Sequence, residues 1–228
     1  ITPSRAVTVD LDVRQIYRLR ILQRDATIRT KINPCRFSLP SVPGVATLRI
    51  PPRLEAVLRA TTVEDEGPFL SMADPIGATL TMPPTWVVLG ADLAMPLLDP
   101  LPTADMLDTA IDEDMDGNPG VTIEAETALC SSIEAAYIAL RTSVTMEGTV
   151  VDLDTISGSV DPTLEQSVLG TSHRCLAAAA SLVIEIVDGS TFSALRVGAD
   201  DDLDGNGNIS CREIALHAPR LFGVFWAM

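Results

Sequence analysis

The sequence predicts an all-β protein, an antiparallel β-barrel or β-sandwich with short helical turns next to acidic loops. Many short segments alternate apolar and polar residues, and glycine, proline and aspartate separate these segments. Sixteen prolines would disrupt a helical bundle but can lie at strand ends and edges. The 46% hydrophobic content of the 228 residues is normal for a globular chain. We expect a single β domain over residues 1–228, with a subdivision near 97–116 as the alternative.

Residues 9–23 and 26–32 are predicted to form the first hairpin. In residues 9–23, apolar side chains such as Leu11, Val13 and Tyr17 alternate with charged ones such as Asp12 and Arg14. Residues 26–32 repeat this alternation, and residues 24–25 between them suit a tight turn. The pattern indicates two strands with one solvated face.

The later part of the chain repeats the strand pattern many times. Further strands are predicted at 46–50, 78–82, 85–89, 136–146, 149–153, 156–160, 164–169, 182–187 and 192–197. Hairpin-type turns are predicted at 147–148 and 188–190. Short helices are expected at 103–111, which Asp105 would cap, and at 210–217, which Pro219 would end.

The net charge of −15 makes nucleic acid an improbable partner, because phosphate binding needs a basic surface. The charge is also uneven: residues 1–60 carry about +7 and the remaining 168 residues about −22. Opposite patches would either pair within one chain or attract copies of the protein head to tail. Self-association, or binding to another surface protein, is therefore a hypothesis.

Four cysteines are widely separated and lack the C-x-x-C spacing of zinc or redox sites. We expect two disulfides, Cys35 with Cys130 and Cys175 with Cys211; four buried free thiols are the alternative. No stretch reaches the 18 apolar residues of a membrane helix, so no membrane span is expected. The expected location is secreted, cell-surface or periplasmic.

The most specific motif is the stretch from Asp202 to Glu213, which follows the twelve-residue EF-hand calcium loop position by position. Its glycine at loop position six, Gly207, permits the sharp bend of such loops. A hard cation needs an oxygen shell, which six residues would supply by side chain, backbone carbonyl or bridging water: Asp202, Asp204, Asn206, Asn208, Ser210 and Glu213. The loop predicts a Ca²⁺ site.

A second acidic loop places three alternating carboxylates before a glycine. Its candidate ligands are Asp112, Asp114, Asp116 and Asn118. It lacks a closing glutamate, because a loop that begins at Asp112 ends on Ile123, and one that begins at Asp114 ends on Ala125. Calcium binding is predicted here too, with an ordinary acidic turn as the alternative.

Two resemblances follow from these motifs. The loop at 202–213 resembles those of EF-hand and dockerin-type calcium proteins over twelve residues, although the segment before it reads as a strand. The stretch D-x-D-x-D-G-N-P-G-V-T at 112–122, with Asp99-Pro-Leu-Pro, Gly148-Thr-Val-Val-Asp, Leu164-Glu-Gln-Ser-Val-Leu-Gly and Leu221-Phe222-Gly, resembles a family of uncharacterised exported myxobacterial proteins. That resemblance spans residues 95–223 and implies a secreted or lipid-anchored, β-rich protein.

The sequence contains no hydrolase, phosphate-binding or dinucleotide fingerprint. Its two histidines, His173 and His217, are more typical of surface or packing residues than of catalytic bases, so an enzyme is not favoured. We therefore expect an exported, calcium-stabilised structural or interaction protein, such as a subunit of an extracellular or cell-surface assembly. The alternatives are a barrel that binds a small apolar ligand and a calcium-dependent hydrolase.

Overall fold

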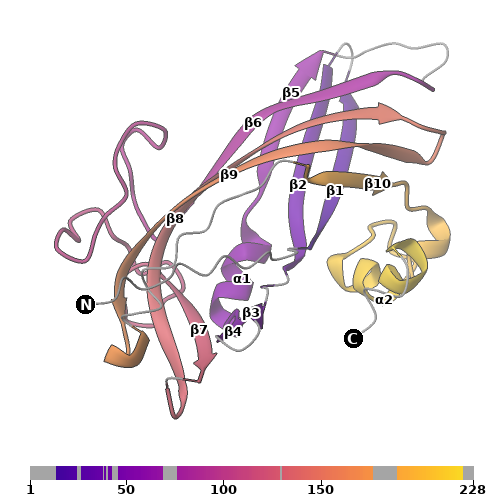
Figure 1. Cartoon of the computed structure of the whole chain (residues 1–228). Coiled ribbons are helices and arrows are strands. Elements are labelled where there is room, and N and C mark those ends of the chain that lie inside the picture. Colours follow the sequence, from indigo (N-terminus) through magenta and orange to yellow (C-terminus); the bar gives the residue numbers. More distant parts are fainter. Residues whose placement is uncertain are drawn as a thin grey trace.

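The computed structural model describes residues 14–24, 27–37, 39, 41–42, 46–68, 76–128, 130–176 and 189–222. It is mostly antiparallel β structure, in which the sheets curl into a half-barrel (Figure 1). The predicted fold class is therefore confirmed. Within the described residues, the buried hydrophobic side chains form three separate clusters.

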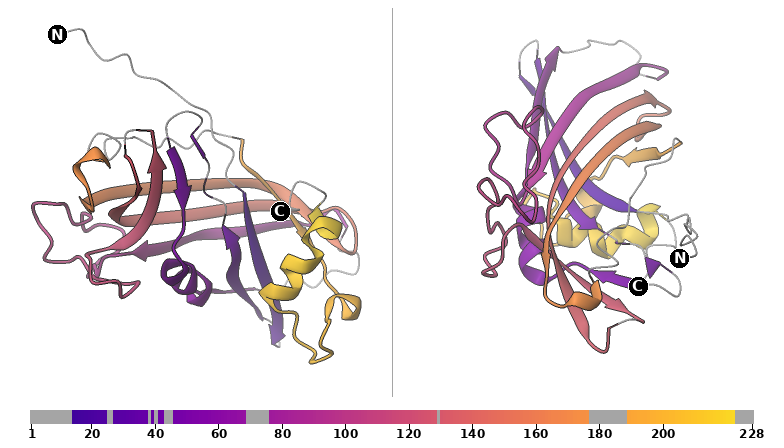
Figure 2. Two further views of the ribbon diagram at one scale, coloured as in Figure 1. Left: turned by 90° about the horizontal axis from the view of Figure 1, so that it is seen from below. Right: turned by 60° about the vertical axis from the view of Figure 1, so that its left-hand side comes forward.

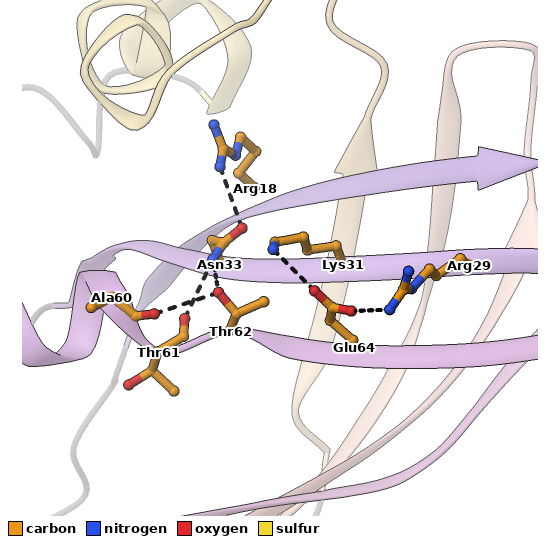
Figure 3. A network of polar contacts seen from close by, with 8 residues as sticks. All are labelled: Arg18, Arg29, Lys31, Asn33, Ala60, Thr61, Thr62 and Glu64. Carbon is orange, nitrogen blue, oxygen red and sulfur yellow. Dashed lines mark hydrogen bonds and ion pairs between the residues drawn. The ribbon is translucent and has the colours of Figure 1, made fainter.

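The smaller sheet has three strands in the order β1 (Gln15–Arg24), β2 (Thr27–Phe37) and β5 (Val63–Pro68). The hairpin of β1 and β2 confirms the first predicted pair, with Leu19 opposite Ile32, and β2 continues beyond residue 32. Strand β5 was not predicted, because its sequence VEDEGP shows no apolar alternation. It pairs with β2 in an antiparallel ladder, with Val63 opposite Ile32, and Glu64 adds exposed ion pairs to Lys31 at 3.0 Å and Arg29 at 2.6 Å (Figure 3).

A buried asparagine connects this sheet to the first helix. Asn33, on β2, is only 8% exposed, so its amide needs partners. Its nitrogen donates to the Thr62 hydroxyl at 2.6 Å and to the Thr61 carbonyl at 3.4 Å, and its oxygen accepts from Arg18 (Figure 3). The network fixes the chain where α1 (Pro52–Ala60) leads into β5.

The larger sheet is built around one long strand, β8 (Ile133–Val150). One edge of β8 pairs along its length with β9 (Thr155–Thr171), while the other edge pairs first with β7 (Val121–Thr127) and then with β6 (Thr79–Leu89). The outer strands are β10 (Thr191–Leu195) beside β9, and β4 (Ala46–Arg49) and β3 (Ser41–Val42) beyond β7. Figure 2 shows the curvature of these long strands.

Two predicted pairs of strands on the β8–β9 hairpin are single strands. The predicted turn at 147–148 lies inside β8, so 136–146 and 149–153 are not separate strands, and β9 joins 156–160 to 164–169. A Cβ atom on Gly158 would lie 1.9 Å from the Glu147 oxygen and 2.5 Å from the Gly148 Cα. These glycines therefore permit a close approach of two backbones, which the sequence alone cannot distinguish from a turn.

Two prolines explain why a third pair of predicted strands is a single strand in the structure. The predicted strands 78–82 and 85–89 form the single strand β6, whose register against β8 shifts between Met82 and Thr85. Pro83 and Pro84 lie at that irregularity, where a missing backbone N–H is tolerated. The predicted strand 192–197 corresponds to β10, whereas 182–187 lies outside the described residues.

The helices differ from prediction in three places. Helix α1 was not predicted; it begins at Pro52, which fits a first helical turn, and it buries Leu54 against Leu89 and Val121. The helix predicted at 103–111 is wrong, because this stretch forms only isolated bridges such as Thr103 with Met106. The predicted C-terminal helix is α2 (Cys211–Phe222), which continues through Pro219. Short 3₁₀ turns are η1 (Arg174–Leu176) and η3 (Ala199–Asp201).

The disulfide pairing differs from the predicted one. The bridges are Cys35–Cys211 and Cys130–Cys175, with Cα atoms 4.9 Å and 5.7 Å apart. Helix α2 packs on the first hairpin, which brings Cys211 to Cys35, and the β8–β9 pairing brings Cys130 and Cys175 to the same end of that hairpin. Two disulfides are typical of an oxidising compartment. None of the helices in the described residues is long and apolar enough to cross a membrane.

Candidate metal centres

The C-terminal acidic loop lies between η3 and α2. It brings together three of its predicted ligands: one carboxylate oxygen each of Asp202, Asp204 and Glu213 lies within 4.8 Å of the others. Both carboxylate oxygens of Asp202 accept backbone N–H groups, from Asn206 at 3.2 Å and from Gly207 at 2.7 Å. Gly207 has φ +76°, the left-handed conformation expected at loop position six.

Glu213 is the most enclosed of these carboxylates, with 5% of the residue exposed. The N–H and hydroxyl of Ser210 both donate to it at 2.7 Å, and the N–H of Leu203 donates from the start of the loop, also at 2.7 Å. The two Ser210 bonds and then those from Leu203 and Asp204 hold the pKa of Glu213 at about 2. The side chain therefore stays ionised, caps α2 and faces the other carboxylates.

The remaining predicted ligands of this loop make local contacts. Asn206 Oδ1 accepts the N–H of Asn208 at 2.7 Å, and Asn208 Oδ1 accepts from Arg20 on β1. Ser210 is engaged with Glu213. Three of the six predicted residues thus converge as carboxylates, and the other three shape the loop and its attachment to the sheet.

The hairpin of β1 and β2 holds this loop in place. Ile214 and Ala218 of α2 are buried with Ile16 and Cys35. The Arg18 guanidinium donates to the Ile209 carbonyl at 3.2 Å. Basic residues of the first hairpin therefore contact the acidic loop of the same chain. This agrees with the interpretation in which the oppositely charged patches pair within one chain.

The first acidic loop has the same local arrangement. Both oxygens of Asp112 accept backbone N–H groups, from Asp116 at 3.0 Å and Gly117 at 2.8 Å, as Asp202 does from the residues four and five positions later. Left-handed φ values occur at Met115 (+56°) and Gly117 (+94°), matching Gly205 (+69°) and Gly207. The geometry therefore selects the register that begins at Asp112.

Asp114 is the buried member of this first loop, with 2% of the residue exposed. Its Oδ2 accepts the N–H of Thr122 at 3.0 Å, while its Oδ1 is buried without a hydrogen-bond partner. Burial, and then the charges of Asp116 and Asp112, raise the pKa of Asp114. Oxygens of the three aspartates lie within 4.8 Å of one another.

Asn118, the fourth predicted ligand of the first loop, supports Asp116. Its backbone N–H donates to Asp116 Oδ1 at 2.9 Å, and its side-chain amide donates to the same oxygen at 3.1 Å. The Thr122 hydroxyl donates to the other Asp116 oxygen. Thr122, the second residue of β7, therefore contacts two of the three carboxylates, a role that the sequence analysis missed.

A third group of potential ligands, Glu134, His173 and Cys175, was also missed. The pairing of β8 with β9 brings these distant residues together, and no spacing rule would have found them. The sulfur of Cys175 belongs to a disulfide, and Glu134 accepts from the hydroxyls of Ser132 and Ser172, which lower its pKa. This group is therefore a weaker metal candidate than the two acidic loops.

One surface hollow can be compared with the alternative function of binding a small apolar ligand. Phe37, Leu39, Leu48, Ile50 and Glu55 line a space of about 240 Å³. Pockets for drug-sized ligands generally measure about 300–1,000 Å³. The hollow is below that range, so it does not favour a small-ligand barrel.

The fold and its loops define a class: a disulfide-bonded, antiparallel β protein with two acidic loops of one shared geometry. Comparison with known proteins does not assign the chain to any family, since no family model, curated protein or solved structure matches it. The resemblance to exported myxobacterial proteins stays an expectation.

Proposed function

We propose that this is an exported structural or interaction protein whose β scaffold is stabilised by calcium at the loop 202–213. One observation carries the proposal: the carboxylates of loop positions one, three and twelve converge within 4.8 Å, although Glu213 lies eleven residues after Asp202. A site whose ligands are all carboxylate oxygens suits a hard cation.

Calcium at this loop would offset the repulsion between three clustered carboxylates. It would also fix the position of α2, because Glu213 both caps that helix and faces the cluster. The disulfide Cys35–Cys211 and the buried residues Ile16 and Ile214 transmit that restraint to the first hairpin. A structural role for the ion follows from this connectivity.

Calcium should stabilise the folded protein measurably. Extracellular calcium modules have dissociation constants on the order of 0.1–1 mM, so 10 mM calcium should add roughly 1.4–2.7 kcal/mol over EDTA. For a chain of this size that is a rise in Tm of about 3–10 °C. Differential scanning calorimetry of the wild type and of Asp202→Asn measures this rise. We expect Asp202→Asn to lose the part of the calcium-induced rise in Tm that comes from this loop.

The control for this experiment is Asp154→Asn, which changes an acidic residue that is 74% exposed on the β8–β9 turn. It should respond to calcium as the wild type does. Equal calcium responses in the wild type and Asp202→Asn would refute a site at this loop. Magnesium at the same concentration separates a specific response from general screening of the negative charge.

An exposed apolar surface supports the interaction role. The excursion from β6 to β7, residues 91–120, carries eight acidic residues and no basic one. It also exposes large apolar side chains: Met95, Leu97, Leu98, Met106, Leu107, Ile111 and Met115. Residues 1–60 carry a net charge of about +7. Although Arg18, Arg20 and Arg53 contact the acidic loops of their own chain, we propose a second copy, through the remaining positive charge of this segment, as the partner.

Self-association should depend on this excursion. We expect Leu98→Ser with Met106→Ser to lower the weight-average mass measured by static light scattering at low salt, and added salt to lower it in the wild type. Leu153→Ser with Leu216→Ser is the matched control, because these leucines are equally exposed but lie elsewhere. A monomeric wild type at every salt and calcium concentration would rule out self-assembly.

A further inference from the structure

The two ends of the excursion 91–120 meet at the first acidic loop. Glu113 accepts the N–H of Gly90, at the end of β6, at 2.6 Å. Asp114 accepts the N–H of Thr122, at the start of β7. The backbone between them is paired as well, since the Gly120 N–H donates to the Ile111 carbonyl at 2.8 Å. The loop therefore closes the base of the excursion.

One carboxylate oxygen at this base has no hydrogen-bond partner among the residues that the structure describes. Asp112, Asp114 and Asp116 place carboxylate oxygens within 4.8 Å of one another, and the guanidinium of Arg53 contacts the neighbouring Met115 carbonyl. The Asp114 Oδ1 atom belongs to a residue that is 98% buried, and it has no hydrogen-bond partner. A buried, unpaired carboxylate oxygen is costly unless a donor or a cation compensates it.

We propose that Asp112, Asp114 and Asp116 hold a second calcium ion, and that this ion fixes the base of the excursion that displays the exposed apolar side chains. A divalent cation supplies the charge that three carboxylates lack, and all three ligands are the oxygen type that calcium prefers. Thr122, on β7, donates hydrogen bonds to Asp114 and Asp116 and so orients both carboxylates. The C-terminal loop has Glu213 in the corresponding role of joining the loop to the next element.

This site is independent of the one proposed at 202–213. The two loops lie in different parts of the chain, and each is bound to different strands: the first to the ends of β6 and β7, the second to β1 and β2. Loss of calcium binding at one loop should therefore leave calcium binding at the other loop unchanged. The first loop controls the presentation of an interaction surface, whereas the second stabilises the scaffold.

Calcium titration by calorimetry of the EDTA-stripped full chain tests the assignment. We expect two ions for the wild type, one for Asp114→Asn and one for Asp202→Asn. If the wild type binds one ion and Asp202→Asn none, the first site does not exist while the proposed function stands. If Asp202→Asn binds as many ions as the wild type and Asp114→Asn binds one fewer, the proposed function fails and this site stands.

Thermal stability of Asp114→Asn distinguishes a ligand from a merely structural residue. The amide keeps an acceptor for Thr122 and removes the unpaired charge, so in EDTA its Tm should equal or exceed that of the wild type. In 10 mM calcium the order should reverse, because only the wild type gains from this ion. A lower Tm of Asp114→Asn in both solutions, by the same amount, would refute the ligand role.

Limited proteolysis reports on the excursion itself. The segment 91–120 contains no lysine or arginine but several leucines and methionines, so chymotrypsin, whose catalysis needs no metal ion, is the suitable protease. We expect calcium to slow cleavage in the wild type and in Asp202→Asn at least several-fold, and to leave cleavage of Asp114→Asn unchanged. Calcium-independent cleavage of the excursion in the wild type would show that the ion does not fix it.

Discussion

Removal of the Cys35–Cys211 bridge is expected to cost more stability than any other single change in this protein. The bridge spans 176 residues of sequence, and the loop-closure model assigns such a cross-link about 5 kcal/mol. The Cys130–Cys175 bridge spans 45 residues, for which the same model gives about 4 kcal/mol. The first bridge also anchors α2 and its calcium loop, so its loss should weaken calcium binding there as well.

Urea unfolding of Cys35→Ala/Cys211→Ala and of Cys130→Ala/Cys175→Ala measures the two contributions. Peptide mapping of the unreduced wild type should first recover the two bridges as paired fragments. We expect the Cys35–Cys211 variant to unfold at lower urea and to lose affinity at 202–213 but not at the first loop. A greater loss of stability from the Cys130–Cys175 variant would contradict this order.

The disulfide pairing also shows where sequence reasoning reaches its limit. The even number of cysteines and their spacing predicted two bridges, but spacing cannot say which strands meet. Helix α2 is amphipathic and packs Ile214 and Ala218 on the first hairpin, so the last cysteine meets the first. That contact is a tertiary property, and no local pattern contains it.

Local patterns performed best where apolar and polar residues alternate in the sequence. The alternation in residues 9–23 and 26–32 was sufficient to place β1 and β2. Strand β5 has no such alternation, although it pairs with β2 along its whole length, and Gly148 resembles a turn residue although it lies in β8. The acidic loops were found because ligand spacing is a local property, whereas Thr122 was missed because its role depends on how β7 begins.

Gly120→Ala should be the most damaging single side-chain addition at the first loop. Gly120 has φ +92°, and a Cβ atom there would lie 2.4 Å from the Ile138 carbonyl oxygen of β8. The neighbouring strand backbone cannot move without breaking the pairing of β7 with β8. Left-handed strain of about 1–2 kcal/mol and overpacking of about 1–3 kcal/mol should add to a loss of roughly 2–5 kcal/mol.

The variant Gly77→Ala separates the backbone strain from the overpacking in the predicted loss of stability. Gly77 has a similar φ, +85°, but a Cβ atom there would meet nothing within 4 Å. Its replacement should cost only the left-handed strain, so the difference between the two variants in urea unfolding, measured in EDTA, gives the overpacking alone. Equal losses would mean that Ile138 does not constrain Gly120. Because Gly120 lies two residues before Thr122, we also expect Gly120→Ala to weaken calcium binding at Asp114 and leave the C-terminal loop unaffected.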